Sequence, residues 1–267
     1  MQRPPVSDHW KSGSPYERYV GRWSRRVAPS FLAWLSVPPG RRWLDVGCGT
    51  GALAAAILER CVPASVAGVE PSEGFRATAR EHLGDRVALH AGTATAVPLG
   101  DASVDVVVSA LVLNFVPDAP AALHEMKRVA TPRGTVAAYV WDYAGRMELM
   151  RHFWEAAAAT DPAAAPIAEA MRFPLCRPEA LEALFAGAGL ADVAVHAIDT
   201  PTPFVDFDDY WQPFLGGQGP APSYAMSLDE EQRARLRERL RAQLPTAADG
   251  SIGLIARAWA VRGRLAG

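Results

Sequence analysis

The glycine-rich segment Trp43-Leu-Asp-Val-Gly-Cys-Gly-Thr-Gly51 has the residue types and spacing of a ligand-binding loop. Glycines between a strand and a helix permit positive φ and let a ligand lie against backbone amides at the helix N-terminus. The run Gly47-x-Gly49-x-x-Ala52 also satisfies the dinucleotide-binding pattern, and Glu70 follows at the distance of a ribose-binding acid. The glycine spacing alone therefore leaves more than one nucleoside cofactor open.

Asp45 separates these alternatives by charge. It lies at the end of the predicted strand, two residues before Gly47, where a carboxylate would repel a pyrophosphate. A carboxylate there suits a ligand with a positive α-amino group, such as the methionyl part of S-adenosylmethionine. Glu70 ends the next predicted strand and could accept hydrogen bonds from both ribose hydroxyls. The two acids together favour the sulfonium cofactor.

Short β-branched runs alternate with helix-length segments around this loop, which predicts a parallel sheet covered by helices on both faces. A last strand over 252–261 is expected to close the sheet. The predicted fold is α/β, a Rossmann-like doubly wound sheet, mostly parallel with a C-terminal antiparallel strand, plus a helical and aromatic cap. The core strands are expected at 43–46, 65–69, 87–90, 104–108 and 135–140, and the core helices at 52–60, 72–83 and 117–130. Ser72 and Pro117 mark two helix starts.

The chain divides into three predicted parts. Residues 1–40 form an N-terminal helical lid, residues 41–145 the cofactor-binding core, and residues 146–267 the cap insertions and the C-terminal strands that complete the sheet. Outside the core we expect helices over 16–35, 146–159, 178–186 and 227–244, a strand over 193–199, and Pro/Gly/aromatic-rich irregular sequence over 200–224. Ser227 and Glu230 have the spacing of a capping box.

Residues 41–140 resemble the class I S-adenosylmethionine-dependent methyltransferases, in particular their small-molecule branch (methyltransferase type 11), which includes ubiquinone/menaquinone C-methyltransferases. The resemblance covers the segment 45–51, the acid Glu70, the loop 91–99 that holds adenine in the family, and the fourth strand and following helix over 101–134. It implies that the cofactor is S-adenosyl-L-methionine. The implied cofactor-binding residues are Asp45, Gly47, Cys48, Gly49, Gly51, Glu70, Pro71, Thr93, Ala94 and Ser109.

One position departs from the family pattern. Thr93 stands where the adenine loop usually carries Asp, so the hydrogen bond to the exocyclic amine of adenine is in doubt. The backbone of Ala94 remains available, and the hydroxyl of Thr93 could replace the missing carboxylate. We expect a changed cofactor affinity.

The resemblance implies transfer of a methyl group to a small, aromatic or polyketide-like acceptor, as in natural-product or quinone-like metabolism. The enzyme must hold the acceptor in line with the methyl–sulfur bond and exclude water, and it needs a base only if the acceptor loses a proton. Asp142 and His152 are the base candidates. Candidates for contacting the acceptor are Tyr16, Tyr19, Asn114 and Trp211.

Two other functions remain open from the sequence. An NAD(P)-dependent oxidoreductase would need a catalytic Tyr-x-x-x-Lys or an equivalent, and the only lysines, Lys11 and Lys127, are not so placed. A non-catalytic cofactor-binding partner protein is the third alternative, against which the aromatic cap argues.

Composition excludes several other classes. The 267 residues carry a net charge of −2, so no basic field favours nucleic acid. Three cysteines without a Cys/His cluster suggest neither a disulfide framework nor a metal site. We expect a cytoplasmic protein, a monomer or homodimer, without nucleic-acid or membrane partners.

Overall fold

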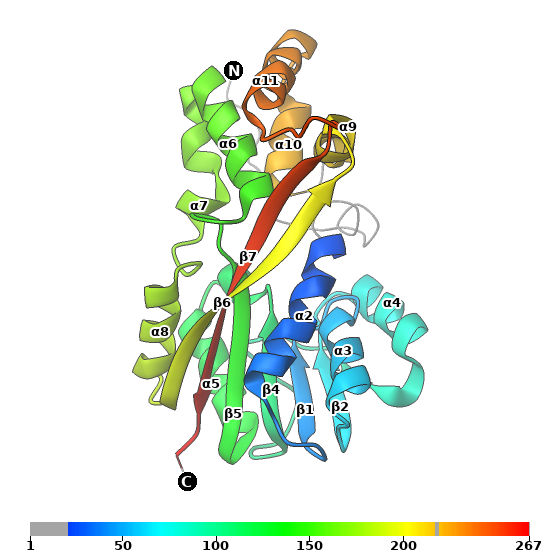
Figure 1. The fold of residues 1–267 in the computed structure, drawn as a ribbon. Helices are drawn as coiled ribbons and strands as arrows, with labels where there is room; N and C mark the ends of the chain where they lie inside the picture. Colours follow the sequence, from blue (N-terminus) through cyan, green and yellow to red (C-terminus); the bar gives the residue numbers. More distant parts are fainter. Residues whose placement is uncertain (1–20, 217–218, 267) are drawn as a thin grey trace. The chain divides into compact units, whose positions relative to one another are not determined.

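Seven strands form one sheet in the computed structural model, which describes residues 21–216 and 219–266. The strand order is β3-β2-β1-β4-β5-β7-β6 (Figure 1). Strands β1 to β5 pair in parallel, and β7 runs antiparallel to β5. This confirms the predicted mostly parallel sheet with an antiparallel C-terminal strand. The strands are β1 (Arg42–Val46), β2 (Ser65–Val69), β3 (Ala88–His90), β4 (Val104–Ala110), β5 (Ala130–Trp141), β6 (Ala191–Phe204) and β7 (Ile252–Arg264).

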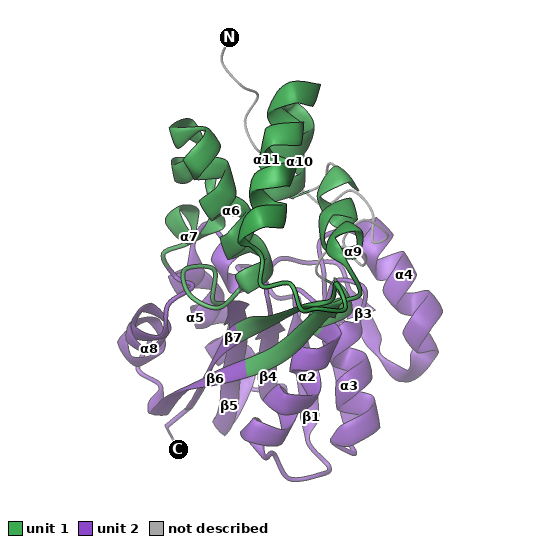
Figure 2. Cartoon of the chain, turned by 45° about the horizontal axis from the view of Figure 1, so that its top comes forward, with its two compact units in different colours: residues 1–24, 142–174, 199–257 green, residues 25–141, 175–198, 258–267 purple. Residues whose placement is uncertain are grey.

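The chain divides into two compact units (Figure 2). Unit 1 comprises residues 1–24, 142–174 and 199–257, and unit 2 comprises residues 25–141, 175–198 and 258–267. The predicted contacts of Tyr16 and Tyr19 lie outside the described residues.

Unit 2 contains the parallel strands and the helices that follow them. Its helices are most of α2 (Arg22–Leu35), α3 (Ala52–Arg60), α4 (Glu73–Leu83), the 3₁₀ turn η3 (Leu113–Phe115), α5 (Ala119–Val129) and α8 (Pro178–Gly187). Ser72 caps α4 as predicted, because its side chain accepts a hydrogen bond from the Phe75 amide at 3.4 Å. The predicted start of α5 at Pro117 is wrong: the N-cap is Asp118, whose carboxylate accepts from the Ala121 amide at 2.9 Å.

Strand β6 corrects the prediction that residues from 200 onward are irregular. It continues through Pro201 and Pro203 to Phe204. Proline cannot donate to a strand ladder, so it is tolerated mainly at a sheet edge. Because β6 is the last strand in the sheet order, it can contain both prolines.

Unit 1 is mainly helical. It contains α6 (Glu148–Thr160), the 3₁₀ turn η4 (Pro162–Ile167), α7 (Glu169–Arg172), α9 (Phe207–Trp211), the 3₁₀ turn η5 (Gln212–Gly216), α10 (Pro220–Ser227) and α11 (Glu230–Gln243). The prediction of one helix over 227–244 with a Ser227/Glu230 capping box is wrong. Ser227 ends α10, where its hydroxyl donates to the Tyr224 carbonyl at 2.7 Å. The capping box is formed by Asp229 and Gln232.

Aromatic side chains form the core of unit 1. Phe153 stacks on Phe214 with ring centroids 4.4 Å apart, and Tyr210 lies 5.4 Å from Phe214. The Tyr210 hydroxyl donates to the carbonyl of Leu149 at 2.9 Å, so this buried polar group is satisfied. Among the described residues, no helix is long and apolar enough to cross a membrane.

Candidate cofactor site

Three glycines follow β1, and each has positive φ: Gly47 at 75°, Gly49 at 53° and Gly51 at 88°. A Cβ on Gly47 would lie 2.7 Å from Val112, and one on Gly51 would lie 2.5 Å from Leu83. A Cβ on Gly49 would meet nothing within 4 Å. Gly47 and Gly51 therefore permit close packing of the protein on itself, whereas the space beside Gly49 is open to a ligand.

Asp45 is the most unusual group near this loop. Its side chain is fully buried, and neither carboxylate oxygen has a well-formed hydrogen bond within the described part of the chain, where the Ala54 amide is only a weak partner. Burial raises the pKa of Asp45 to about 7; the Ala54 amide opposes this rise, and the charge of Glu70 adds to it. A buried carboxylate without a strong partner is costly, so this position has an unmet demand for a cation or a hydrogen-bond donor.

Glu70 lies at the carboxyl end of β2, where backbone amides fix its carboxylate. One oxygen accepts from the Gly49 amide at 3.1 Å and the other from the Ser72 amide at 2.9 Å. Burial raises the pKa of Glu70, while these two amides and the charge of Arg76 oppose that rise. Arg76 also donates to the carbonyls of Glu70 at 2.6 Å and Pro71 at 2.8 Å, so the strand end is braced.

Cys48 and Ser109 make contacts that hold the loop against the sheet. The Cys48 thiol is buried, which raises its pKa above the usual range, and its sulfur would lie 2.8 Å from a Cβ on Gly68. The buried Ser109 hydroxyl donates to the Val46 carbonyl at 2.9 Å, joining β4 to the end of β1. Both residues thus support the loop by packing or hydrogen bonding.

The predicted adenine loop, residues 91–99, folds into a turn around Thr93 and Ala94. Thr93 forms an isolated bridge with Ala96, whose amide donates to the Thr93 carbonyl at 3.2 Å. The Thr93 hydroxyl lies 3.3 Å from that of Thr95. The other end of the loop contacts Glu125 and Arg128, which our sequence reasoning missed. An acid and a base three residues apart usually indicate only a surface pair on a helix.

Asn114 lies in η3, directly after β4. Its side-chain Nδ2 is buried and has no hydrogen-bond partner among the residues that the structure describes. The neighbouring Val112 packs against Gly47, which brings this segment beside the glycine loop. Asn114 is thus a polar group of unit 2 with an unused donor near the candidate cofactor site.

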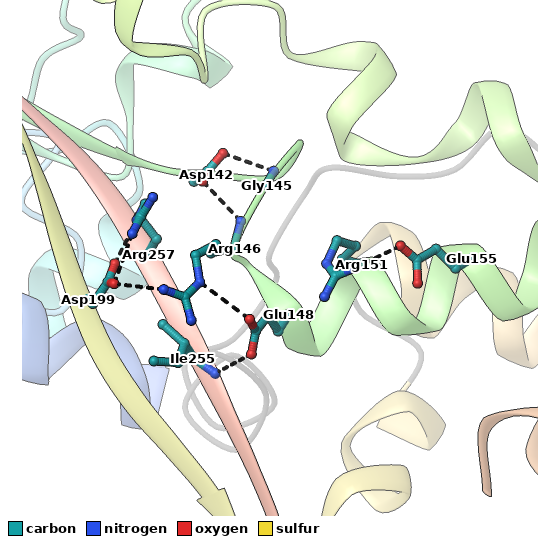
Figure 3. Close-up of polar contacts among 9 residues, drawn as sticks. All are labelled: Asp142, Gly145, Arg146, Glu148, Arg151, Glu155, Asp199, Ile255 and Arg257. Atoms are coloured by element: carbon teal, nitrogen blue, oxygen red, sulfur yellow. Dashed lines mark hydrogen bonds and ion pairs between the residues drawn. The ribbon is translucent and has the colours of Figure 1, made fainter. Parts of the chain in front are cut away.

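Asp142 and His152, the predicted base candidates, belong to unit 1. The two Asp142 oxygens accept from the amides of Gly145 and Arg146, both at 2.9 Å, and so stabilise the turn after β5 (Figure 3). Arg146 also pairs with Glu148 and Asp199 in this cluster. His152 lies in α6; burial lowers its pKa, as does the charge of Arg151.

Trp211 is also in unit 1, where it is only 3% exposed. Its ring stacks on Phe207 with a centroid distance of 6.5 Å and lies 6.1 Å from Phe214. These contacts give Trp211 a packing role, and its contact with an acceptor stays a prediction.

Residues 44–138, which contain the glycine loop and its two acids, match the methyltransferase domain family. The matched segment, about a third of the chain, is similar to methyltransferase domains. It is 36% identical to a malonyl-[acyl-carrier protein] O-methyltransferase of Serratia marcescens over 42% of this chain and 43% of that protein. It is 31% identical to a trans-aconitate 2-methyltransferase of Variovorax paradoxus over 59% of each protein. The chain thus matches about half the length of these curated relatives.

A solved structure shares the fold beyond the matched domain. Phosphoethanolamine N-methyltransferase 2 of Haemonchus contortus, in complex with S-adenosyl-L-methionine, has a TM-score of 0.58 and 16% identity to this chain. The similarity covers 95% of this chain and 56% of that one. At this identity the likeness establishes the Rossmann-like fold alone.

Proposed function

We propose that this protein is an S-adenosylmethionine-dependent methyltransferase that acts on a small-molecule acceptor. The observation that carries the proposal is the buried carboxylate of Asp45, without a well-formed hydrogen bond, at the start of the glycine loop. An ammonium group would supply the missing partner, and S-adenosylmethionine has one on its methionyl part. Glu70 is a second carboxylate whose charge acts on Asp45, so the site favours a cationic ligand.

The residues present fit this cofactor. Asp45 would accept from its ammonium group, and Glu70, already oriented by the Gly49 and Ser72 amides, would accept from the ribose hydroxyls. The open space at Gly49 would let the ligand approach the backbone, and the turn at Thr93 and Ala94 would contact adenine. The bound cofactor supplies an electrophilic methyl group, so the chain's own task is to bind and orient both molecules.

The acceptor is the less constrained part of the proposal. The aromatic content of unit 1 supports an aromatic or polyketide-like acceptor. The relatives named for malonyl and trans-aconitate support a carboxylate acceptor, since both of those groups carry carboxylates. The unused Nδ2 of Asn114 could donate to an acceptor oxygen. A carboxylate acceptor needs no base, whereas a phenol would need one.

If a base is needed, His152 fits that role better than Asp142. The lowered pKa of His152 favours the neutral imidazole, which can accept a proton at neutral pH. Both Asp142 oxygens already accept hydrogen bonds from the backbone of their own turn. We therefore propose that Asp142 stabilises its own turn, and we keep His152 as the base candidate for acceptors that must lose a proton.

An NAD(P)-dependent oxidoreductase is disfavoured by Asp45. A dinucleotide would bring its pyrophosphate to the glycine loop, where the Asp45 carboxylate would repel it. Titration calorimetry with S-adenosylhomocysteine and NAD distinguishes the two. We expect binding of the former only, and tighter binding of NAD would overturn the proposal.

Glu70→Gln tests the ribose assignment. Loss of a charge-assisted acceptor should weaken S-adenosylhomocysteine binding by about 2 kcal/mol. The 2′-deoxyribose analogue should lose much less affinity through this substitution, because one of the relevant hydroxyls is already absent. Equal losses for both ligands would contradict the assignment. Transfer of a labelled methyl group to a panel of carboxylic acids and phenols then identifies the acceptor class.

A further inference from the structure

Helix α5 determines the shape of the predicted adenine loop. The Val97 amide donates to Glu125 Oε2 at 2.9 Å, and Arg128 Nη2 donates to the Val97 carbonyl at 2.9 Å. Arg128 Nη1 donates to the Leu99 carbonyl, also at 2.9 Å. The two side chains of α5 therefore satisfy main-chain groups along one end of the loop, where unpaired backbone groups would otherwise be costly.

The Glu125–Arg128 pair is itself held in a fixed geometry. Arg128 Nε donates to Glu125 Oε1 at 2.7 Å and Nη2 to Glu125 Oε2 at 2.8 Å, which is a bidentate pair. Arg128 Nη1 also reaches Asp101 at 2.6 Å. Hydrogen bonding from Arg128 lowers the pKa of Glu125 to about 2, so the carboxylate is ionised at neutral pH. Every nitrogen of the Arg128 guanidinium group thus has a partner.

The loop has no charged side chain of its own that could replace this support. Residues 91–99 contain no acidic or basic residue. A Cβ on Gly92 would lie 2.7 Å from Pro98, so the two limbs of the loop approach each other closely. Ligand recognition by such a loop depends on its main-chain donors and acceptors, and their directions depend on how well the loop is held.

We propose that Glu125 and Arg128 are positioning residues for adenine binding. They fix the loop so that the main chain around Thr93 and Ala94 recognises the base, without the acidic side chain that Thr93 replaces. This inference rests on the proposed function, because it concerns the adenine of the proposed cofactor. Under this proposal the Glu125–Arg128 pair on α5 determines the base selectivity of the loop 91–99, which lies about 30 residues earlier in the chain.

Arg128→Lys tests the proposal, because lysine keeps the charge but lacks the planar fork. The matched control is Arg42→Lys, since Arg42 makes a similar fork to Asp105 (Nε at 3.1 Å and Nη2 at 2.8 Å) at the start of β1. Calorimetry gives the Kd of S-adenosylhomocysteine and of S-inosylhomocysteine for each protein. We expect the preference for the adenine ligand to fall about tenfold in Arg128→Lys and to be unchanged in Arg42→Lys.

Hydrogen exchange of the cofactor-free protein provides an independent readout. The Val97 amide should exchange about tenfold faster in Arg128→Lys than in wild type, with wild-type exchange in Arg42→Lys. If Arg128→Lys does not fold, Glu125→Gln replaces it in both measurements, with the same expected changes. The inference would be overturned if Arg128→Lys lowers the melting temperature but leaves both the base preference and the exchange rate of the Val97 amide at their wild-type values. Wild-type protein that binds neither nucleoside would overturn the proposed function, and the adenine assignment with it.

Discussion

Asp45→Asn should stabilise the cofactor-free protein while weakening cofactor binding. Burial raises the pKa of Asp45 from 3.8 to about 7, a difference of about 3.2. At about 1.4 kcal/mol per pKa unit, ionising this group in the folded state costs about 4 kcal/mol of unfolding free energy. Asparagine is neutral at every pH and avoids this cost.

The pH window of this effect follows from the direction of the change in pKa. Below pH 3.8 the carboxyl group is neutral in both the folded and the unfolded protein. Between pH 3.8 and about 7 it ionises mainly in the unfolded state, so the stability of the wild-type protein falls as pH rises. Above about pH 7 both states are ionised and the loss is complete.

Urea unfolding at pH 5, 6, 7 and 8.5 measures this difference. The stability advantage of Asp45→Asn should grow by about 2 kcal/mol between pH 5 and pH 7 and then level off. Asp105→Asn is the matched control, because hydrogen bonding to Arg42 lowers the Asp105 pKa to about 2. Asp105 is therefore ionised in both states throughout this range, and its variant should show no comparable slope.

The reasoning is refuted if the wild-type and Asp45→Asn stability curves run parallel from pH 5 to pH 8.5. Calorimetry supplies the second half of the prediction. Loss of a charge-assisted partner for the ammonium group should weaken S-adenosylhomocysteine binding by about 2 kcal/mol, or about thirtyfold. Wild-type affinity in a folded Asp45→Asn protein would show that the carboxylate does not contact the ligand.

Two further predictions concern the glycine loop and the aromatic core of unit 1. Gly49→Ala should fold with about 1 kcal/mol of backbone strain and weaken cofactor binding, whereas Gly51→Ala should lower the melting temperature more, because its Cβ meets Leu83. Equal effects of the two substitutions on both stability and affinity would contradict this division of roles. Trp211→Ala should cost about 3–5 kcal/mol of unfolding free energy in chemical denaturation and leave cofactor affinity unchanged. Unchanged stability with impaired acceptor kinetics would instead favour an acceptor-contacting role.

Local sequence signals predicted much of unit 2. The helix over 52–60 has the predicted bounds, and the Ser72 cap forms as expected, because a short polar side chain before an apolar helix has few alternatives. The charge of Asp45 pointed to a cationic ligand, but only the structure reveals that its carboxylate is fully buried without a well-formed hydrogen bond. The burial of a residue depends on which elements pack around it, and the residues next to it in the sequence do not specify those elements.

Long-range contacts explain what the sequence did not predict. The Glu125–Arg128 pair looks like an ordinary helical ion pair until its contacts with Val97 and Leu99 are known. The prolines of β6 suggested irregular structure because the edge position of that strand is a property of the sheet order. The Ser227 and Asp229 positions compete for one helix start, and the choice depends on α10 ending at Ser227.

The antiparallel pairing of β5 with β7 has a consequence for synthesis of the chain on the ribosome. Residues 135–141 of β5 pair with residues 258–264 of β7, which leave the ribosome much later. Until then, this edge of β5 has no native partner and presents the backbone groups of an apolar strand that includes Val136 and Val140. Strand β6 also cannot join the sheet until β7 is synthesised, because β7 is its neighbour in the sheet. Nascent chains that stop before β7 should therefore depend strongly on chaperones, because the exposed edge of β5 can pair with a strand other than β7.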